Sequence, residues 1–162
     1  MKKHVILAVI FSALFVMQAM TADVPEGLPA ANGEAFWVYI SETSPYSDWG
    51  TWPGHPGIYP GKSPHGSYLK LYANEIALKA AKEGKSMPYG SILVKENYAK
   101  NKKTLMAVTP MYKVHGYNPD KGDWFWAKYG PAGKTIASGK VEGCITCHSV
   151  RKTQDWIFTQ PR

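Results

Sequence analysis

Two cysteines and a histidine lie together near the end of the chain, in the stretch "CITCH" at residues 144–148. Cys144 and Cys147 are the only cysteines among the 162 residues. The spacing C-x-x-C-H is typical of covalent haem c attachment, in which each thiol adds to one haem vinyl group and the next imidazole can bind the iron. The sequence therefore predicts one haem c, held by Cys144 and Cys147, with His148 as the iron ligand.

Two other kinds of site use closely spaced cysteines. A structural zinc ion normally takes four ligands, commonly from a second Cys or His pair, and the sequence contains no second pair. A thioredoxin-like redox motif lies next to a βαβ unit, which the strand pattern described below does not indicate. A disulfide between Cys144 and Cys147 would close only a very small loop. The sequence therefore favours haem over zinc and over dithiol chemistry.

The side of the iron opposite His148 receives no ligand from the end of the chain. The tail, residues 149–162, contains no methionine and no histidine. The haem is therefore either open, and able to bind a small molecule, or closed by an upstream residue. The upstream candidates are His55, His65, His115, Met87, Met106, Met111 and Lys95. Methionines in apolar runs are usually core residues, so an open face is the first expectation.

The N-terminus has the layout of a secretory signal peptide, which we place at residues 1–22. Lys2 and Lys3 precede an uncharged apolar run that ends at Ala22, as export signals require; a retained membrane anchor is the alternative. Residues 23–162 would then form a single haem domain in the periplasm. Cleavage would lower the formal net charge from +7 to +5. That charge suits a solvated surface or the docking of a redox partner, and we expect no nucleic-acid binding.

The remaining chain predicts more strand than helix. Apolar alternation and β-formers indicate strands at 67–72, 90–98, 105–114 and 124–129. Helices are expected at 34–42 and 74–84, turns at 118–123 and 130–134, and a packed aromatic loop at 44–66. Pro110 is expected to mark an edge or a bulge. The fold class is therefore α+β, mainly an antiparallel β-sheet with a few packed helices.

This combination resembles the cytochrome P-460 family, which includes the c′-beta cytochromes. The resemblance covers residues 64–160 and rests on "YLKLYANEIALKAAKEG", "GSILVKENY", "DWFWAKY", "CITCH" and the tail "DWIFT". It implies a mostly antiparallel fold, often dimeric, that carries a five-coordinate haem c with His148 as the proximal ligand. A homodimer is therefore compatible with the resemblance.

In the cytochrome P-460 branch a lysine is covalently cross-linked to the haem ring, in a strand of the form G-x-x-x-V-K-E. Lys95 in "GSILVKE" matches that lysine. Alternation along the strand places Lys95 on one face with Ser91 and Leu93. If that face covers the haem, Lys95 can reach the ring, and burial would lower its pKa; an outward-facing lysine is the alternative. The arginine that the branch carries in the preceding strand has no counterpart in "SYLKLY", where Lys70 is only a nearby cation.

Three functions remain open at this point. The first is redox handling of a small nitrogen species, hydroxylamine or nitric oxide, at an open haem, with electrons passed to a partner cytochrome. Whether such a protein turns over a substrate is left open, and no residue is assigned as a proton acceptor. The second is gas binding of the c′-beta kind. The third is plain periplasmic electron transfer, with a sixth ligand such as His65 or Met111.

Overall fold

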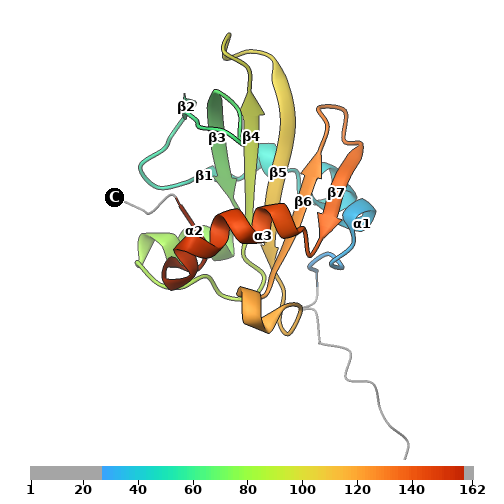
Figure 1. The fold of residues 1–162 in the computed structure, drawn as a ribbon, viewed down its shortest axis with the longest axis vertical. Coiled ribbons are helices and arrows are strands. Elements are labelled where there is room, and N and C mark those ends of the chain that lie inside the picture. The colour runs from blue at the N-terminus through green and yellow to red at the C-terminus, as the bar shows by residue number, and fades with distance from the viewer. Residues whose placement is uncertain (1–26, 159–162) are drawn as a thin grey trace, which may run out of the picture.

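The structure, a computed structural model, describes residues 27–158, and these form an antiparallel sheet with helices on both faces (Figure 1). The α+β prediction is confirmed. The predicted signal peptide, residues 1–22, lies outside the described residues. Within the described part of the chain, no helix is long and apolar enough to cross a membrane.

The sheet has seven strands. In chain order they are β1 (Gly50–Thr51), β2 (Tyr59–Pro60), β3 (Tyr68–Ala73), β4 (Ile92–Tyr98), β5 (Leu105–Lys113), β6 (Trp124–Tyr129) and β7 (Thr135–Gly139). The spatial order is β1-β3-β4-β5-β6-β7, and β2 also pairs with β3. Every pairing is antiparallel. This topology contains no βαβ unit among the described residues, which removes the thioredoxin-like alternative.

Three α-helices pack on the sheet. They are α1 (Gly33–Val38), which continues as a π-helix over Tyr39–Thr43, α2 (Glu75–Lys82) and α3 (Glu142–His148). Short 3₁₀ helices span Tyr46–Asp48, Pro119–Lys121 and Ser149–Gln154. Asn74 caps α2, as the sequence indicates, because its side chain accepts a hydrogen bond from the backbone N–H of Ala77. In Figure 1, α3 crosses the front of the sheet and α1 lies behind it.

The two faces of the sheet carry separate cores. Behind it, Phe36 of α1 packs against Tyr112 and Phe125, with ring centroids 5.5 Å apart in both pairs. Ile92 and Val94 belong to this rear core, whereas Leu93 faces the front. The alternation predicted for β4 is therefore present, and it places Lys95 on the front face of the sheet.

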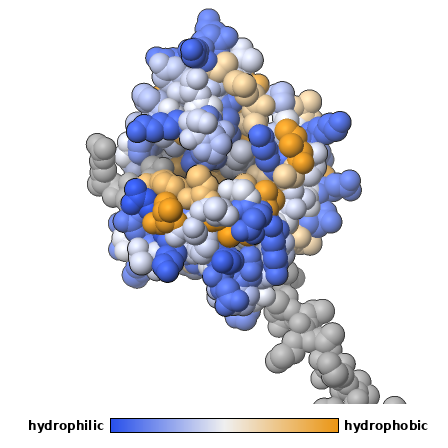
Figure 2. Space-filling view, viewed as in Figure 1, coloured by the Kyte–Doolittle hydropathy of each residue, from blue (hydrophilic) through white to orange (hydrophobic). Residues whose placement is uncertain are grey.

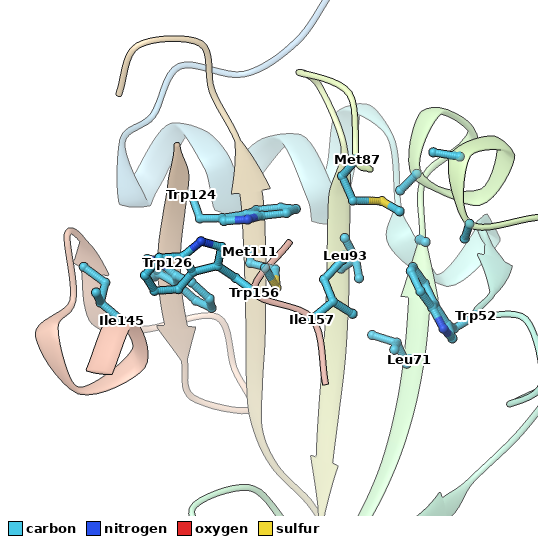
Figure 3. Close-up of a cluster of buried hydrophobic side chains, with 14 residues drawn as sticks. Trp52, Leu71, Met87, Leu93, Met111, Trp124, Trp126, Ile145, Trp156 and Ile157 are labelled. Carbon is cyan, nitrogen blue, oxygen red and sulfur yellow. The ribbon is translucent and has the colours of Figure 1, made fainter. Parts of the chain in front are cut away.

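The front core lies under α2, α3 and the C-terminal tail (Figure 3). It is rich in tryptophan: Trp52, Trp124, Trp126 and Trp156 are all buried. Trp52 comes from the aromatic loop, so that loop packs on the sheet as predicted. Leu93 of β4 and Met111 of β5 belong to the same core. This core supports one end of the front face and leaves the other end for a cavity.

The structure differs from the sequence prediction in several elements and at one proline. The two-residue strands β1 and β2 lie in the segment predicted as a loop, and strand β7 and helix α3 were not predicted, although α3 carries the cysteine motif. Pro110 was expected to mark an edge or a bulge. The edge is wrong, because β5 lies inside the sheet between β4 and β6, and no register shift occurs at Pro110. Pro110 itself is paired with Val94 of β4. On the β6 side, Val108 and Met111 have partners, whereas Thr109 and Pro110, which lie between them, have none. Since proline lacks an N–H, pairing is interrupted on the β6 side only.

Candidate haem site

A pocket of about 500 Å³ lies between α3 and the front of the sheet. Its volume falls in the range of about 300–1,000 Å³ that is usual for ligand and cofactor sites. The lining includes apolar side chains of β3, β4 and β5, namely Leu71, Leu93 and Met111. Cys144, Cys147 and His148 line the opposite wall. The structure therefore brings the cysteine motif to a cavity large enough for a sizeable apolar group.

Helix α3 presents the three residues of the motif at different depths. His148 is buried, Cys144 is half-buried and Cys147 is exposed. Both cysteines are free thiols, and burial raises the pKa of the Cys144 thiol. A haem with one edge near the surface could be bonded to both thiols while its iron lies deeper, beside His148. The depths of the three side chains fit that attachment.

The imidazole of His148 is fixed by the C-terminal tail. Its Nδ1 lies 2.6 Å from the carbonyl oxygen of Trp156. A carbonyl only accepts, so Nδ1 carries the proton and Nε2 keeps its lone pair. The rings of Trp126 and Phe158 hold the imidazole from the sides, with centroids 4.6 and 5.1 Å from it. Burial lowers the pKa of His148, which keeps the ring neutral, as a metal ligand must be.

The carbonyl of Trp156 is held in place by an unusual turn. Asp155 and Trp156 both have positive φ angles, 54° and 65°, a conformation that costs non-glycine residues free energy and is often found at functional sites. The Asp155 carboxylate forms an ion pair with Lys113 of β5 and accepts a hydrogen bond of 2.7 Å from the backbone N–H of Met87. These contacts offset the strain and fix the carbonyl beneath His148.

Lys95 lines the same pocket from β4. Its neighbours across the strands are Leu71 of β3 and Thr109 of β5. Among the described residues, its ammonium group has no carboxylate partner and no hydrogen-bond partner. Burial without such a partner lowers the pKa of Lys95 to about 8. The outward-facing alternative is therefore wrong, and about a tenth of the amine is neutral at pH 7.

The seven candidates for the sixth iron ligand differ in whether they line the pocket. Lining the pocket are His65, Lys95, Met106 and Met111. Outside it lie His55, His115 and Met87. His55 and His115 contact tyrosine rings elsewhere, and Met87 belongs to the front core. Met106 is 57% exposed, which leaves His65, Lys95 and Met111 as the residues with side chains held inside the site.

Two further observations bear on what the pocket can hold. The indole N–H of Trp126, which is buried and lines the pocket, has no hydrogen-bond acceptor among the described residues. Buried donors are normally satisfied, so a bound group that offers an acceptor fits here. Within residues 27–158, no group of three or more His, Cys, Asp or Glu side chains could hold a metal ion. The donor set thus fits an iron that brings its own macrocycle, and it does not fit a structural zinc ion.

The antiparallel sheet, the front pocket and the C-x-x-C-H motif on the C-terminal helix define a class of c-type haem protein. A family model described as cytochrome P460 matches residues 37–159, more than half of the chain, so the protein belongs to the cytochrome P460 family. That family consists of c-type cytochromes that bind haem c and take part in redox reactions of nitrogen species. A search of curated proteins finds no match.

One relationship in the site was not accessible from the sequence. His65 belongs to the aromatic loop and Asn97 to β4, and the structure joins them by a hydrogen bond of 3.0 Å. The two residues lie 32 positions apart, and no periodicity connects a loop residue with a strand residue. The only signal was the presence of His65 among seven possible ligands.

Proposed function

We propose that the protein is an exported mono-haem c-type cytochrome that handles a small nitrogenous molecule, hydroxylamine or nitric oxide, by redox chemistry. Cys144 and Cys147 would attach the haem, and His148 would bind its iron through Nε2. The observation that carries this proposal is the hydrogen bond from His148 to the carbonyl of Trp156, because it leaves Nε2 free inside a pocket shared with both cysteines. When bound, the haem would supply one-electron chemistry and a site for a small ligand.

The residues of the chain give this site its character. Trp126 and Phe158 exclude water from the sides of His148, and the carbonyl of Trp156 increases the basicity of the imidazole. On the sheet side, Leu71 and Leu93 offer an apolar wall. Such a wall favours a small uncharged molecule over a charged one, because a charged group would lose its hydration there.

Besides the two cysteines, Lys95 is a side chain in the pocket that suits a covalent bond to the ring. Its amine lies in the cavity with a lowered pKa of about 8, so the neutral nucleophilic form is populated. We extend to Lys95 the cross-link that the resemblance implies. In a digest with trypsin, a bonded Lys95 would resist cleavage, and residues 86–100 would remain joined to the haem peptide.

Visible spectra of the purified ferric and ferrous protein, with and without nitric oxide or hydroxylamine, test the proposed function. Wild type and Lys95→Ala are compared, and Lys70→Ala on the neighbouring strand serves as the matched control. We expect both ligands to change the wild-type spectrum, and we expect Lys95→Ala alone to alter it without ligand. A spectrum unchanged in Lys95→Ala would remove the cross-link. A haem that ignores both ligands would remove nitrogen chemistry and leave electron transfer.

A further inference from the structure

His65 and His148 reach the same pocket from separate parts of the chain. His65 lies between β2 and β3, and His148 lies at the end of α3. Their ring centroids are 6.4 Å apart, and the ring planes are nearly perpendicular, at 83°. That separation lies in the upper part of the 4.5–7 Å range that is usual for aromatic pairs, and Trp126 lies much closer to His148, at 4.6 Å. The contact between the two imidazoles is therefore a loose one.

The hydrogen bonds of Asn97 determine which nitrogen of His65 is free. The amide nitrogen of Asn97 donates to the carbonyl oxygens of Lys95 and Ala107, at 3.0 and 3.2 Å. Its amide oxygen accepts from the backbone N–H of Gly66, at 3.1 Å. The same oxygen lies 3.0 Å from Nδ1 of His65, so Nδ1 must donate. Nε2 of His65 is left with its lone pair, as Nε2 of His148 is.

Gly66 shows that this arrangement depends on the local backbone. A Cβ atom at position 66 would lie 2.6 Å from the backbone nitrogen of Tyr98 and 2.7 Å from its carbonyl oxygen. Such distances are not possible without a shift of the backbone, so a side chain here would push the loop away from β4. The absence of a side chain at Gly66 lets the loop approach closely enough for His65 to reach Asn97.

The separation of the two rings distinguishes between two uses of His65. Two imidazoles on opposite sides of one metal atom have centroids about 6 Å apart, because each nitrogen–metal bond is about 2 Å long and each ring centroid lies roughly 1 Å beyond its nitrogen. A histidine that only hydrogen-bonds to a molecule lying between it and the metal needs roughly 3 Å more. The observed 6.4 Å matches the first arrangement and is too short for the second.

We propose that His65 binds the haem iron through Nε2, on the side opposite His148, in the resting protein, and that a small ligand must displace it. This inference rests on the proposed haem attachment. It differs from an open haem in that the sixth position of the iron is closed by His65 until a ligand arrives. His65 lies in the segment between β2 and β3, outside both strands. Its imidazole can therefore leave the iron without breaking a strand pairing, while His148 stays fixed by α3 and the tail.

Electron paramagnetic resonance and visible spectra of the holoprotein test the resting ligand. We expect six-coordinate, low-spin iron in the wild type and high-spin iron in His65→Gly, with free imidazole restoring the low-spin spectrum. His55→Ala, which changes a histidine of the same loop outside the pocket, should behave as wild type. If His65→Gly does not fold, His65→Met gives a second test, because a sulfur ligand raises the reduction potential.

Carbon monoxide binding to the ferrous protein tests displacement. If the closed form outnumbers the open form about tenfold, His65→Gly should bind carbon monoxide about tenfold more tightly than wild type. High-spin, five-coordinate iron in the wild type would overturn the inference, as would a low-spin spectrum that survives His65→Gly and is lost in Met111→Leu or Lys95→Ala. A wild type that binds no carbon monoxide would overturn displacement. Extraction with acidic acetone distinguishes this outcome from a failure of the proposed haem attachment, because only a haem that is not covalently bound would be extracted.

Discussion

The Nδ1 atom of His148 lies 2.6 Å from the carbonyl oxygen of Trp156, eight residues further along the chain. The bond fixes both the tautomer and the direction of the ring, so that the nitrogen available to a metal is determined before any haem is attached. Asn97 does the same for His65. The chain thus prepares two imidazoles with free Nε2 atoms in one pocket, and the predictions below follow from how each is held.

The ion pair between Lys113 and Asp155 should hold the tail that positions His148. The two side chains are only 13% and 15% exposed. Asp155→Ala would leave the ammonium group largely buried and unpaired, and would also remove the acceptor for the N–H of Met87. We expect the free energy of unfolding to fall by about 3 kcal/mol, as measured by denaturant titration of the holoprotein.

The surface pair Lys85–Glu83 provides the control for that experiment. Its side chains are 71% and 40% exposed, and exposed pairs add little because water screens them. Glu83→Ala should leave the free energy of unfolding unchanged within error. Equal effects of the two substitutions would show that Asp155 has no special role in anchoring the tail.

Gly66→Ala should displace His65 without touching any candidate ligand. The added methyl group would meet the backbone of Tyr98, so the loop must move away from β4 and weaken the bond to Asn97. We expect a mixture of high-spin and low-spin iron in place of the low-spin spectrum expected for the wild type. Gly57→Ala is the control, because a Cβ there meets nothing within 4 Å. An unaltered spectrum in Gly66→Ala would contradict the positioning by this glycine.

A cavity in either core should destabilise the protein, but only a cavity in the front core should also change the haem spectrum. Phe36 is fully buried in the rear core, away from the pocket. Phe36→Ala should lower the free energy of unfolding by about 4 kcal/mol and leave the haem spectrum unchanged. Leu93→Ala in the front core should also destabilise the protein, and in addition alter the spectrum, because Leu93 lines the pocket. Parallel chemical denaturation and visible spectra measure both effects.

Lys95 should make stability depend on pH in the haem-free protein, prepared as the Cys144→Ala, Cys147→Ala variant. Burial lowers its pKa from 10.5 to about 8 in the folded state. Between these two values the unfolded chain binds the extra proton, so the free energy of unfolding rises with pH. The gain is about 3 kcal/mol at most and is absent below pH 8.

Urea titrations across that pH range measure the slope. Lys95→Met should abolish it, and Lys128→Met, which changes an exposed lysine at the pocket rim, should retain it. A slope that persists in Lys95→Met would assign the titration to another group.

Local patterns explain why much of the fold was predictable. Strand β6 occupies the predicted range, and the alternation in β4 correctly gave the face of Lys95. Strand β7 was missed because its residues are mostly exposed and show no apolar alternation. Helix α3 was missed because it is seven residues long and contains cysteine, threonine and glycine, which are weak helix formers.

The site was predictable only where its residues lie close together in the chain. The motif from Cys144 to His148 is local, so spacing alone indicated haem. The partners of the two histidines are not local: Asn97 meets His65 only through the sheet, and Trp156 meets His148 through a turn with two positive φ angles. Aspartate is enriched among residues with positive φ angles but tryptophan is not, so the sequence does not predict two such residues in succession.

The face of the molecule around α3 exposes apolar side chains at the edge of the pocket. Figure 2 shows apolar side chains exposed beside α3 and hydrophilic residues around them. Met106, Ile136 and Phe158 are 57%, 58% and 43% exposed and all line the pocket. The exposed edge of a haem attached to Cys147 would lie among them, which suits brief contact with a redox partner.

The most direct test of the account is the mass of the tryptic peptide of residues 141–151 from the holoprotein after extraction with acidic acetone. This peptide contains both cysteines and His148. We predict that it carries the mass of one haem, with residues 86–100 added where Lys95 is bonded to the ring, and that Cys144→Ala, Cys147→Ala yields the peptide without haem. A wild-type peptide that carries two free thiols and no haem would contradict the central claim.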